Sequence, residues 1–386
     1  MDFQSVWAEI NLKTIGNNIT QVRGITGPDV GLMIVVKANA YGHGIVEVAR
    51  CAKDNGADAL GVAKISEAAC LRDAGIDLPV LIFGFTPSSF AKHLAAYDLI
   101  QTVYSYEMAQ ALSLASVLSG EKIRVHIKVD TGMGRLGLLS DCFRNFDALS
   151  EKKNRIVHEI ESISKLPGLK TEGVFTHFAT ADSKDKTYAN RQFKIFQEVL
   201  DQLHSHGLDI PVKHAANSAA IVDMPETHLN MVRSGILTYG LYPSADVNHN
   251  LVDIEPAMVL KTKIIHIKRV QPGFKVSYGA LFETKNAGII ATVPIGYSDG
   301  LSRLLSSRGY MLVSGKRANI AGRICMDLTM LDVDDNINVA LEDEVVIIGR
   351  QGDDFIAADD IASLTGTINY EVLTSIPENL KRYYIR

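Results

Sequence analysis

The short run around Lys37 contains the residues with the clearest potential for chemistry. Residues 35–44 read V-V-K-A-N-A-Y-G-H-G, so a lysine stands where an apolar run stops, with Tyr41 four positions later. Burying an ammonium costs several kcal/mol unless it is paired or neutralised. A desolvated lysine has a lowered pKa and becomes an amine nucleophile, which suits a Schiff base with an aldehyde cofactor such as pyridoxal phosphate. The lysine alone leaves a second interpretation open, in which its side chain simply extends to water.

A regular scaffold around this lysine is predicted by the pattern of the first two thirds of the chain. From residue 32 to about 240, short runs rich in Val, Ile and Leu alternate with longer amphipathic stretches, and helical spacing is clearest in 105–118 and 186–206. Strands buried on both faces are continuous apolar runs, so eight repeats of strand then helix predict a (β/α)8 barrel of the TIM type. The predicted strands are 32–36, 59–63, 79–83, 100–104, 123–129, 173–177, 212–215 and 232–237.

A second, mostly β domain is predicted after residue 244. A polar linker, A-D-V-N-H-N, is followed by alternating residues over 258–270 and by strand-like runs at 288–293, 310–313, 328–333 and 344–348. We therefore predict a cofactor-binding barrel over 1–244 and a β-rich domain over 245–386, since single cores seldom exceed about 250 to 300 residues. Residues 1–12 precede the first barrel strand and are candidates to pair with the β-rich domain.

Composition favours a small molecule as the partner. The chain has 386 residues, is 47% hydrophobic and has a formal charge of −5. This balance predicts no nucleic-acid or anionic-membrane partner, and the absence of long apolar runs predicts a cytoplasmic protein. The cysteines have no C-x-x-C pair and the histidines no zinc-like spacing, so we expect neither disulfides nor a metal site. We expect buried, reduced thiols at Cys51, Cys70, Cys142 and Cys325.

Further polar residues fall at the ends of the predicted strands. In a (β/α)8 barrel the active site lies at the carboxyl ends of the strands, and the loops after strands seven and eight often bind phosphate. We therefore expect these residues to lie together. They are Lys37 after strand one, Arg135 in K-V-D-T-G-M-G-R after strand five, His177 in F-T-H-F after strand six, Asn217 and Ser218 in H-A-A-N-S-A-A after strand seven, and Arg233, Gly235 and Ile236 in V-R-S-G-I at strand eight.

These motifs together resemble those of the alanine racemase family. The match runs from W-A-E-I-N at residues 7–11 to I-N-Y-E-V at residues 368–372, which is nearly the whole chain. The resemblance implies a pyridoxal-phosphate enzyme with a barrel followed by a β domain. It also implies a homodimer with shared active sites, in which each subunit completes the site of the other.

Two acid/base residues follow from this resemblance. Lys37 matches the Schiff-base lysine, and Tyr278 in V-S-Y-G-A matches the second base, which reaches the site from the other subunit. Inverting one carbon without rotating the substrate requires an acid/base group on each face. A phenol is a poor base at neutral pH because its ordinary pKa is near 10, so His177 and Arg233 are the candidates that favour its deprotonated form. Arg233 matches the arginine facing the pyridine nitrogen, and His214 continues its hydrogen-bond chain.

The resemblance also assigns binding residues. Arg135 matches the arginine that contacts the cofactor's phenolic oxygen and the substrate carboxylate. Lys128 occupies the position of a lysine whose carbamylation fixes that arginine, while an ordinary contact with Asp130 is the alternative. Ser234 replaces a proline of the family's R-P-G-I, which frees φ and adds an N–H that could soften the phosphate loop. The implied phosphate ligands are Tyr41, Ser218, Tyr370 and the N–H groups of Gly235 and Ile236; Tyr297, Met326 and Asp327 are implied to shape the substrate pocket from the partner, beside a buried Cys325.

The expected function is interconversion of L-alanine and D-alanine, with supply of peptidoglycan precursors as the implied role and a catabolic role equally compatible. A pocket for a methyl group discriminates weakly, since an added hydroxyl or methylene is worth only about 1 to 3 kcal/mol. A serine or broad-specificity racemase is therefore the nearest alternative. A decarboxylase is expected to place a carboxylate where Arg233 stands, and a non-catalytic pyridoxal-phosphate carrier has no use for Tyr278.

Overall fold

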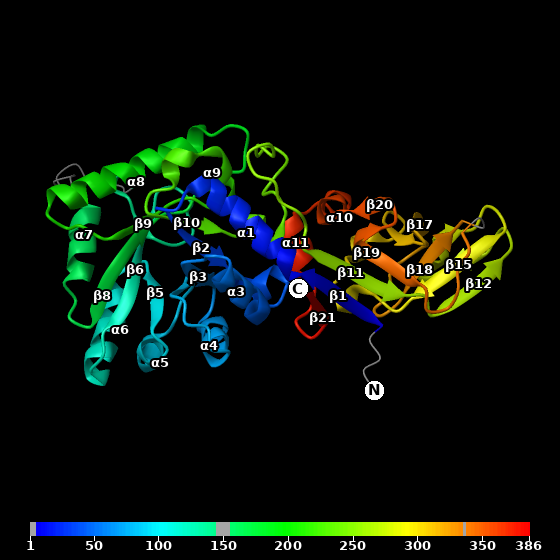
Figure 1. Cartoon of the computed structure of the whole chain (residues 1–386), viewed down its shortest axis with the longest axis horizontal. Helices are drawn as coiled ribbons and strands as arrows, with labels where there is room; N and C mark the ends of the chain where they lie inside the picture. The colour runs from blue at the N-terminus through cyan, green and yellow to red at the C-terminus, as the bar shows by residue number, and fades with distance from the viewer. Residues whose placement is uncertain (1–4, 144–154, 335–336) are drawn as a thin grey trace. The chain divides into compact units, whose positions relative to one another are not determined.

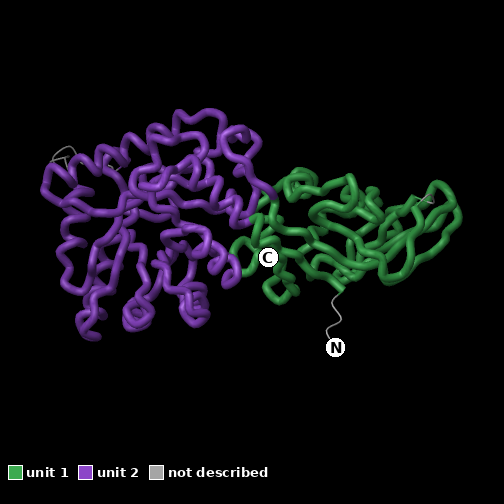
Figure 2. Tube along the Cα trace, in the orientation of Figure 1, with its two compact units in different colours: residues 1–14, 39–44, 256–386 green, residues 15–38, 45–255 purple. Residues whose placement is uncertain are grey.

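The computed structural model describes residues 5–143, 155–334 and 337–386. The chain forms two compact units (Figure 2). Residues 15–38 and 45–255, purple and keyed as unit 2 in the figure, are called the first unit below, and residues 1–14, 39–44 and 256–386, green and keyed as unit 1, are called the second unit. The division falls after Glu255 and not after residue 244, because the segment that follows residue 244 is tied to the first unit. In that segment Asn248 N donates to Asp223 Oδ1 at 3.1 Å, and Glu255 N donates to Asn18 Oδ1 at 3.0 Å.

The first unit is a closed parallel barrel, which confirms the predicted fold class. Its strands pair in the order β5-β4-β3-β2-β10-β9-β8-β6, and β5 also pairs with β6 to close the ring. The strands are β2 (Gly31–Val35), β3 (Ala59–Val62), β4 (Val80–Ile82), β5 (Leu99–Val103), β6 (Ile123–Asp130), β8 (Leu169–Phe175), β9 (Val212–His214) and β10 (Met231–Ser234), with the short β7 (Leu138–Leu139) beside β6.

Helices follow most of the barrel strands (Figure 1). Every residue of β3, β4 and β5 is buried, including the polar Gln101 and Thr102 of β5. Local capping sets the helix ends: Ser105 Oγ accepts from Met108 N at 3.2 Å to start α6, and Gly120 ends it with a φ of 81°. The helices are α1 (Leu12–Thr26), α3 (Ile45–Asp54), α4 (Ile65–Asp73), α5 (Ala91–Ala96), α6 (Tyr106–Ser119), α7 (Arg155–Ser164), α8 (Thr187–Ser205) and α9 (Ser218–Asp223).

The predicted strands differ from the observed ones mainly at their carboxyl ends. The sixth barrel strand, β8, ends at Phe175, so His177 lies two residues beyond it. The eighth, β10, ends at Ser234, because Gly235 has a φ of −107° and a ψ of −98° that break the strand, and a 3₁₀ turn, η4 (Ile236–Tyr239), follows. The first difference moves Thr176 and His177, and the second moves Gly235 and Ile236, from the strands into the segments that follow them at the end of the barrel.

The second unit is built on one mixed sheet. Its strand order is β12-β15-β18-β17-β16-β19-β11-β1-β21, with β20 beside β19, and β1 pairs antiparallel with β11 and parallel with β21. The strands are β1 (Val6–Asn11), β11 (Met258–Lys263), β12 (His266–Val270), β15 (Gly288–Val293), β16 (Tyr310–Val313), β17 (Lys316–Ile320), β18 (Thr329–Val333), β19 (Glu344–Gln351), β20 (Asp354–Ile356) and β21 (Lys381–Ile385), beside a separate hairpin of β13 (Lys275–Val276) and β14 (Phe282–Glu283).

The single run predicted over 258–270 is two strands. The first, β11, pairs with β19, and the second, β12, pairs with β15. The change of partner falls at Ile264 and Ile265, where Ile264 N donates to Asp343 O and Ile265 N donates to Thr292 O. Two short helices that sequence analysis did not predict, α10 (Ala358–Thr365) and α11 (Asn369–Thr374), belong to this unit. Within the described ranges, none of the helices has the length and apolar character needed to cross a membrane.

Candidate active site

Arg233 is buried at the carboxyl end of β10, and neutral acceptors surround its guanidinium. Its Nη1 donates to His214 Nδ1 at 2.9 Å, and its Nη2 lies 3.2 Å from His177 Nδ1. The same Nη2 donates to the carbonyl oxygens of Thr176 at 2.9 Å and Ala215 at 2.8 Å. Burial lowers the pKa of Arg233 to about 9, which is still above neutral pH, so the group remains a cation.

The donors of Arg233 determine the tautomers of a buried histidine chain. A guanidinium only donates, so His214 accepts at Nδ1 and carries its proton on Nε2. That Nε2 lies 2.9 Å from His126 Nδ1, to which it therefore donates. Burial followed by the charge of Arg233 lowers the pKa of His214 well below its ordinary value, and burial lowers that of His126 to about 4. Both rings are neutral at pH 7, and His214 stacks on Phe175 with a centroid distance of 4.6 Å.

Two lysines of the barrel have lowered pKa values. Burial, and then the nearby charge of Arg135, lowers the pKa of Lys37 below its ordinary value. Burial, Arg135 and Arg233 lower the pKa of Lys128 to about 8. Lys128 Nζ also lies 5.8 Å from the centroid of the Phe175 ring. The barrel thus places two amines that lose their protons more easily than free lysines near the charges of Arg135 and Arg233.

Lys37 begins a left-handed turn. The short helix α2 (Lys37–Tyr41) has φ values of 51° to 53° from Ala38 to Tyr41, a conformation that costs about 1–2 kcal/mol per residue with a Cβ. Glu67 holds the start of the turn, because its Oε1 accepts from Ala38 N at 2.6 Å while its Oε2 accepts from Ala63 N at 2.8 Å. Sequence analysis missed Glu67, because the N-cap three residues before it is Lys64 and not the Ser or Thr that marks a capping box.

The end of the same turn belongs to the second unit. His43 Nδ1 lies 2.9 Å from Tyr41 O and 3.2 Å from Ala40 O, so the imidazole donates to both carbonyls. Gly42 has a φ of 81°, and a Cβ added to it would lie 2.4 Å from the backbone oxygen of Leu373, so only glycine fits here. Arg382 Nε donates to the Gly42 carbonyl at 2.7 Å. The histidine and the first glycine of the motif, Gly42, therefore shape the backbone.

Tyr41 and Tyr370, two of the predicted phosphate ligands, lie together within the second unit. Their ring centroids are 5.9 Å apart. Tyr41 is buried, and burial raises the pKa of its phenol, so its hydroxyl keeps its proton and can donate.

Arg135 is carried by a loop that Asp130 organises. Asp130 Oδ1 accepts from the N–H groups of Gly132 at 2.9 Å and Met133 at 2.9 Å, and its Oδ2 accepts from Gly134 at 3.0 Å. The positive φ values of Gly132 and Gly134, 125° and 70°, allow this tight path. Arg135 itself is exposed at the end of the loop.

The predicted phosphate loops after the seventh and eighth barrel strands meet. Ser218 Oγ accepts from Gly235 N at 2.9 Å, which joins the start of α9 to the loop after β10. Asn217 Oδ1 accepts from Ala220 N at 3.1 Å, so this side chain caps α9. Ser234, the residue that departs from the family's proline, is buried, and its Oγ lies 2.8 Å from Thr238 Oγ1. The serine hydroxyl thus makes a contact that a proline cannot make.

Gln192 on α8 is a further residue that sequence analysis missed. Its Nε2 donates to His177 O at 3.1 Å and its Oε1 accepts from Ala179 N at 2.8 Å, so it holds the loop that carries His177. Burial and then Arg233 lower the pKa of His177 well below its ordinary value. A glutamine on an amphipathic helix has no sequence signal for this role, since it is recognisable only from the fold.

The predicted pocket residues of the second unit lie together at its surface. Tyr278 is 68% exposed and follows Ser277, whose φ is 66°. It borders an open depression of about 420 Å³, together with Met326 and Asp327. Tyr297 N donates to Cys325 O at 3.1 Å, which attaches the loop of Tyr297 to the same segment.

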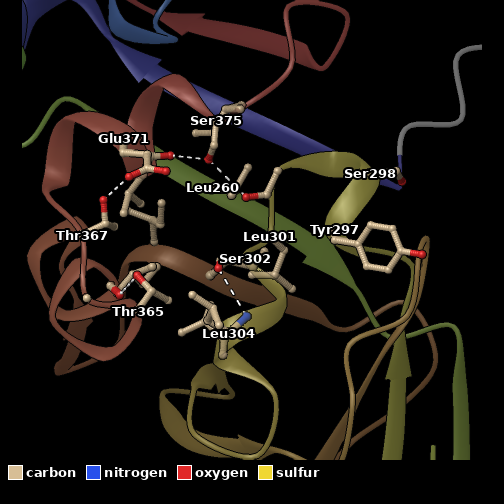
Figure 3. A pocket seen from close by; sticks show the side chains of 18 residues that line it. Leu260, Tyr297, Ser298, Leu301, Ser302, Leu304, Thr365, Thr367, Glu371 and Ser375 are labelled. Atoms are coloured by element: carbon tan, nitrogen blue, oxygen red, sulfur yellow. Dashed lines mark hydrogen bonds between the residues drawn. The ribbon is translucent and has the colours of Figure 1, made fainter. Parts of the chain in front are cut away.

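A larger cavity of the second unit, about 560 Å³, lies between the segment from Tyr297 to Leu305 and α10 and α11 (Figure 3). Mostly aliphatic side chains and hydroxyls line it. At its edge, Thr367 Oγ1 donates a hydrogen bond to Glu371 Oε2. Tyr297 is the one predicted site residue among its lining residues. We therefore place the candidate active site at the end of the barrel and not in this cavity.

The cysteines differ from expectation. Cys51 is buried, but Cys70 and Cys142 are exposed and Cys325 is only partly covered, so the prediction of four buried thiols is wrong. Cys70 lies on α4 and Cys142 in a short 3₁₀ turn, where a small apolar side chain at the surface costs little. All four are free.

Comparison with known proteins gives one consistent result. The family models described as alanine racemase N-terminal domain and C-terminal domain match residues 10–243 and 257–384. The chain is 50% identical over 380 residues to an alanine racemase of Desulfosudis oleivorans, covering 98% of this chain and 96% of that protein. It is 46% identical over 380 residues to one of Methanococcus maripaludis, covering 98% of each.

Solved structures agree. An alanine racemase of Clostridium difficile has a TM-score of 0.92 at 40% identity, covering 100% of this chain and 97% of that one. One from Bacillus anthracis with bound L-Ala-P has a TM-score of 0.91 at 38% identity, covering 100% and 96%. The barrel, the β-rich second unit and these matches over nearly the full length show that the chain belongs to the alanine racemase family.

Proposed function

We propose that this chain interconverts L-alanine and D-alanine with pyridoxal phosphate, using Lys37 and Tyr278 as its two bases. The observation that supports this most is the buried cation Arg233, held by neutral His214 and by main-chain carbonyls at the end of the barrel. Burying a guanidinium costs free energy, so a buried arginine is expected to be fully paired or to have a function. In the family the matching arginine faces the ring nitrogen of the cofactor.

The residues at the end of the barrel fit this cofactor. Lys37 offers an amine of lowered pKa, as attachment to an aldehyde requires. Ser218 and the adjoining N–H groups of Gly235 and Ile236 form a neutral cradle suited to a phosphate, beside the cap of α9 formed by Asn217. When bound, pyridoxal phosphate withdraws electrons and so acidifies the Cα–H bond of an attached amino acid. Tyr41 and Tyr370 remain predicted phosphate ligands.

Arg233 determines how strongly that electron withdrawal acts. Its pKa of about 9 lets it donate to a ring nitrogen at neutral pH without giving up its proton. Weaker withdrawal favours return of a proton to the same carbon over transamination. A decarboxylase is expected to have a carboxylate here, so Arg233 also argues against that alternative.

The two proton carriers act from opposite faces. Lys37 Nζ removes or returns the proton on the face of the D isomer, and the phenol oxygen of Tyr278 does so on the other. Tyr278 is 68% exposed, and Leu281 and Met326 of the same unit are 65% and 54% exposed. Such exposed apolar side chains are typical of a surface that another chain covers. We propose that Tyr278 enters the site of a second copy, so that the active unit is a homodimer.

His177 is proposed to prepare the tyrosine. Because His177 Nδ1 faces a donor of Arg233, its Nε2 carries the proton. An N–H donated to a phenol oxygen favours the deprotonated form of the phenol. Arg233 therefore acts on Tyr278 through His177, while His214 and His126 support Arg233 from behind.

Lys128 is proposed to be carbamylated. Its pKa of about 8 leaves a fraction of neutral amine at pH 7, which adds to carbon dioxide to give a carbamate and one released proton. The product places a negative charge beside Arg135, Arg233 and Lys37, whose positive charges surround Lys128. The alternative, a contact with Asp130, is less favoured because both oxygens of Asp130 accept from loop N–H groups. A carbamate ¹³C signal from labelled bicarbonate, absent in Lys128→Met, tests this proposal.

The substrate is tested by racemisation of a panel of L-amino acids on the cofactor-loaded protein, followed by loss of optical rotation. Fast turnover of alanine with little of serine supports the proposal, whereas comparable rates across the panel favour a broad-specificity racemase. No turnover with the cofactor absorbance intact favours a carrier. Supply of D-alanine for peptidoglycan in the cytoplasm is the role we propose from the family, and a deletion strain that grows without D-alanine contradicts it.

The shared site is tested with hybrid dimers. Lys37→Ala and Tyr278→Ala chains are each expected to be inactive, and a mixture should regain part of the activity because some hybrid sites contain both bases. Tyr278→Phe should lose racemisation while keeping the absorbance of the bound cofactor. No recovery after verified subunit exchange contradicts the homodimer with shared sites.

A further inference from the structure

A cluster of two histidines and one glutamate lies on the barrel unit, on α7 and at the end of α8. His158 and Glu161 are one turn apart on α7, and His206 directly follows α8. His206 Nδ1 lies 2.9 Å from Glu161 Oε1, and His158 Nδ1 lies 3.5 Å from Glu161 Oε2. One ligand atom from each of the three residues can be chosen so that all lie within 4.8 Å of one another.

These spacings are close to those of a bound transition metal. A tetrahedral ion with bonds of about 2.0–2.2 Å separates its ligand atoms by about 3.4 Å. Two imidazoles and one carboxylate are a set of ligands that suits zinc and similar ions. We infer that His158, Glu161 and His206 bind a divalent transition metal ion such as zinc, with the fourth position open to water.

The cluster stands on firm elements. Helix α7 buries Ile156, Val157, Ile160 and Ile163 on its other face, so the face with His158 and Glu161 is directed outward. His206 N donates to Gln202 O at 3.1 Å, which fixes the residue to the last turn of α8. The side chains of His158, His206 and Glu161 are 63%, 27% and 20% exposed, so an ion can reach them from solvent.

The site differs from the proposed active site in every residue. It also differs from what the sequence predicts, because His158 and His206 lie on separate helices and a search for short metal-binding spacings cannot find them. A bound ion would join α7 to the end of α8, where His206 Nδ1 already lies 2.9 Å from Glu161 Oε1. The expected effect of the ion is therefore a stabilised barrel and not a change in the chemistry of racemisation.

Zinc titration of the cofactor-loaded protein by calorimetry tests the inference. The wild-type chain should bind one zinc ion that His158→Ala and His206→Ala each weaken by at least about tenfold. His204→Ala is the matched control, since His204 lies on α8 two residues away, is exposed and is outside the cluster. Zinc bound by thiols or by the cofactor is unaffected by these substitutions and so appears in all four proteins.

Thermal unfolding gives a second readout. Zinc should raise the unfolding temperature of the wild-type protein and of His204→Ala, but not that of His158→Ala or His206→Ala, because only the first two bind the ion in the folded state. In the presence of excess chelator, added zinc should leave the unfolding temperature of each of the four proteins unchanged. Equal zinc affinity and equal stabilisation in all four, or no zinc binding by the wild-type protein, overturns the inference.

Discussion

The hydrogen-bond chain from Arg233 through His214 to His126 can be tested by replacing His214 with phenylalanine. A phenyl ring retains the stacking on Phe175, at 4.6 Å between ring centroids, but makes neither of the two 2.9 Å hydrogen bonds. A hydrogen bond to a charged group is worth about 1.5–3 kcal/mol and one between neutral groups about 0.5–1.5 kcal/mol. We therefore expect His214→Phe to lower the free energy of unfolding by about 2–4 kcal/mol.

The matched variant is His126→Leu, which breaks the hydrogen bond between His214 Nε2 and His126 Nδ1 and leaves the one between His214 and Arg233 in place. The two substitutions share one bond, so the double variant should be less destabilised than the sum of the single variants by about 0.5–1.5 kcal/mol. The two single variants should also differ in their effect on catalysis. His214→Phe is expected to lower kcat/KM by about tenfold to a hundredfold because Arg233 loses a support, and His126→Leu should lower it less.

The assay is urea unfolding of the cofactor-loaded proteins, followed by circular dichroism at one fixed protein concentration, because the stability of an oligomer depends on concentration. Racemisation rates are measured on the same samples. Additive effects within about 0.3–0.5 kcal/mol would mean that His214 and His126 act independently. That result, or an equal loss of kcat/KM in both single variants, refutes the chain as described.

Two further predictions concern the turn at Lys37 and the buried histidines. Glu67→Gln should lower the free energy of unfolding by about 1–3 kcal/mol. A glutamine has only one acceptor oxygen, so either Ala38 N or Ala63 N, which now donate to the two carboxylate oxygens of Glu67, loses its hydrogen-bond partner. Since Glu67 raises the pKa of Lys37, the same variant should also move the acidic limb of the pH–rate profile to lower pH. Burial lowers the pKa of His43 and of His126 to about 4, so each is neutral when folded and takes up a proton on unfolding below pH 6.5. Each should therefore lower the free energy of unfolding by roughly 1 kcal/mol between pH 7 and pH 5.5, measured by urea unfolding at both values, and His43→Gln should flatten this dependence.

The sequence predicted the barrel because its strands are buried on both faces. The runs at 59–63 and 79–83 are continuous and apolar, and β3 and β4 are buried throughout. By contrast, β17 alternates exposed and buried residues in K-R-A-N-I, and β21 is largely polar. Strands of this kind are held by pairing with their neighbours, which no local pattern shows.

The site residues also divide into those that local sequence features predict and those that only the fold reveals. Lys37, Arg135, His177, Ser218 and Arg233 were predicted because their types and their place after apolar runs suggest chemistry, and the barrel unit contains them all. Glu67, His126 and Gln192 were missed. Each acts through a partner distant in the sequence: Glu67 on Ala38 N, His126 on His214, and Gln192 on the His177 loop. Their roles follow from the fold, so sequence analysis of one chain has no means to find them.

The motif K-A-N-A-Y-G-H-G shows why one stretch can be so informative. Four successive residues with a Cβ in the left-handed region cost together about 4–8 kcal/mol, which no isolated peptide would tolerate. The turn persists because Glu67 accepts at its start, because His43 donates to two of its carbonyls, and because Arg382 donates to Gly42 at its end. Most of these residues do no chemistry. They hold Lys37 at the end of β2 in one conformation, and a lysine whose position depends on so many contacts must appear in the sequence together with them.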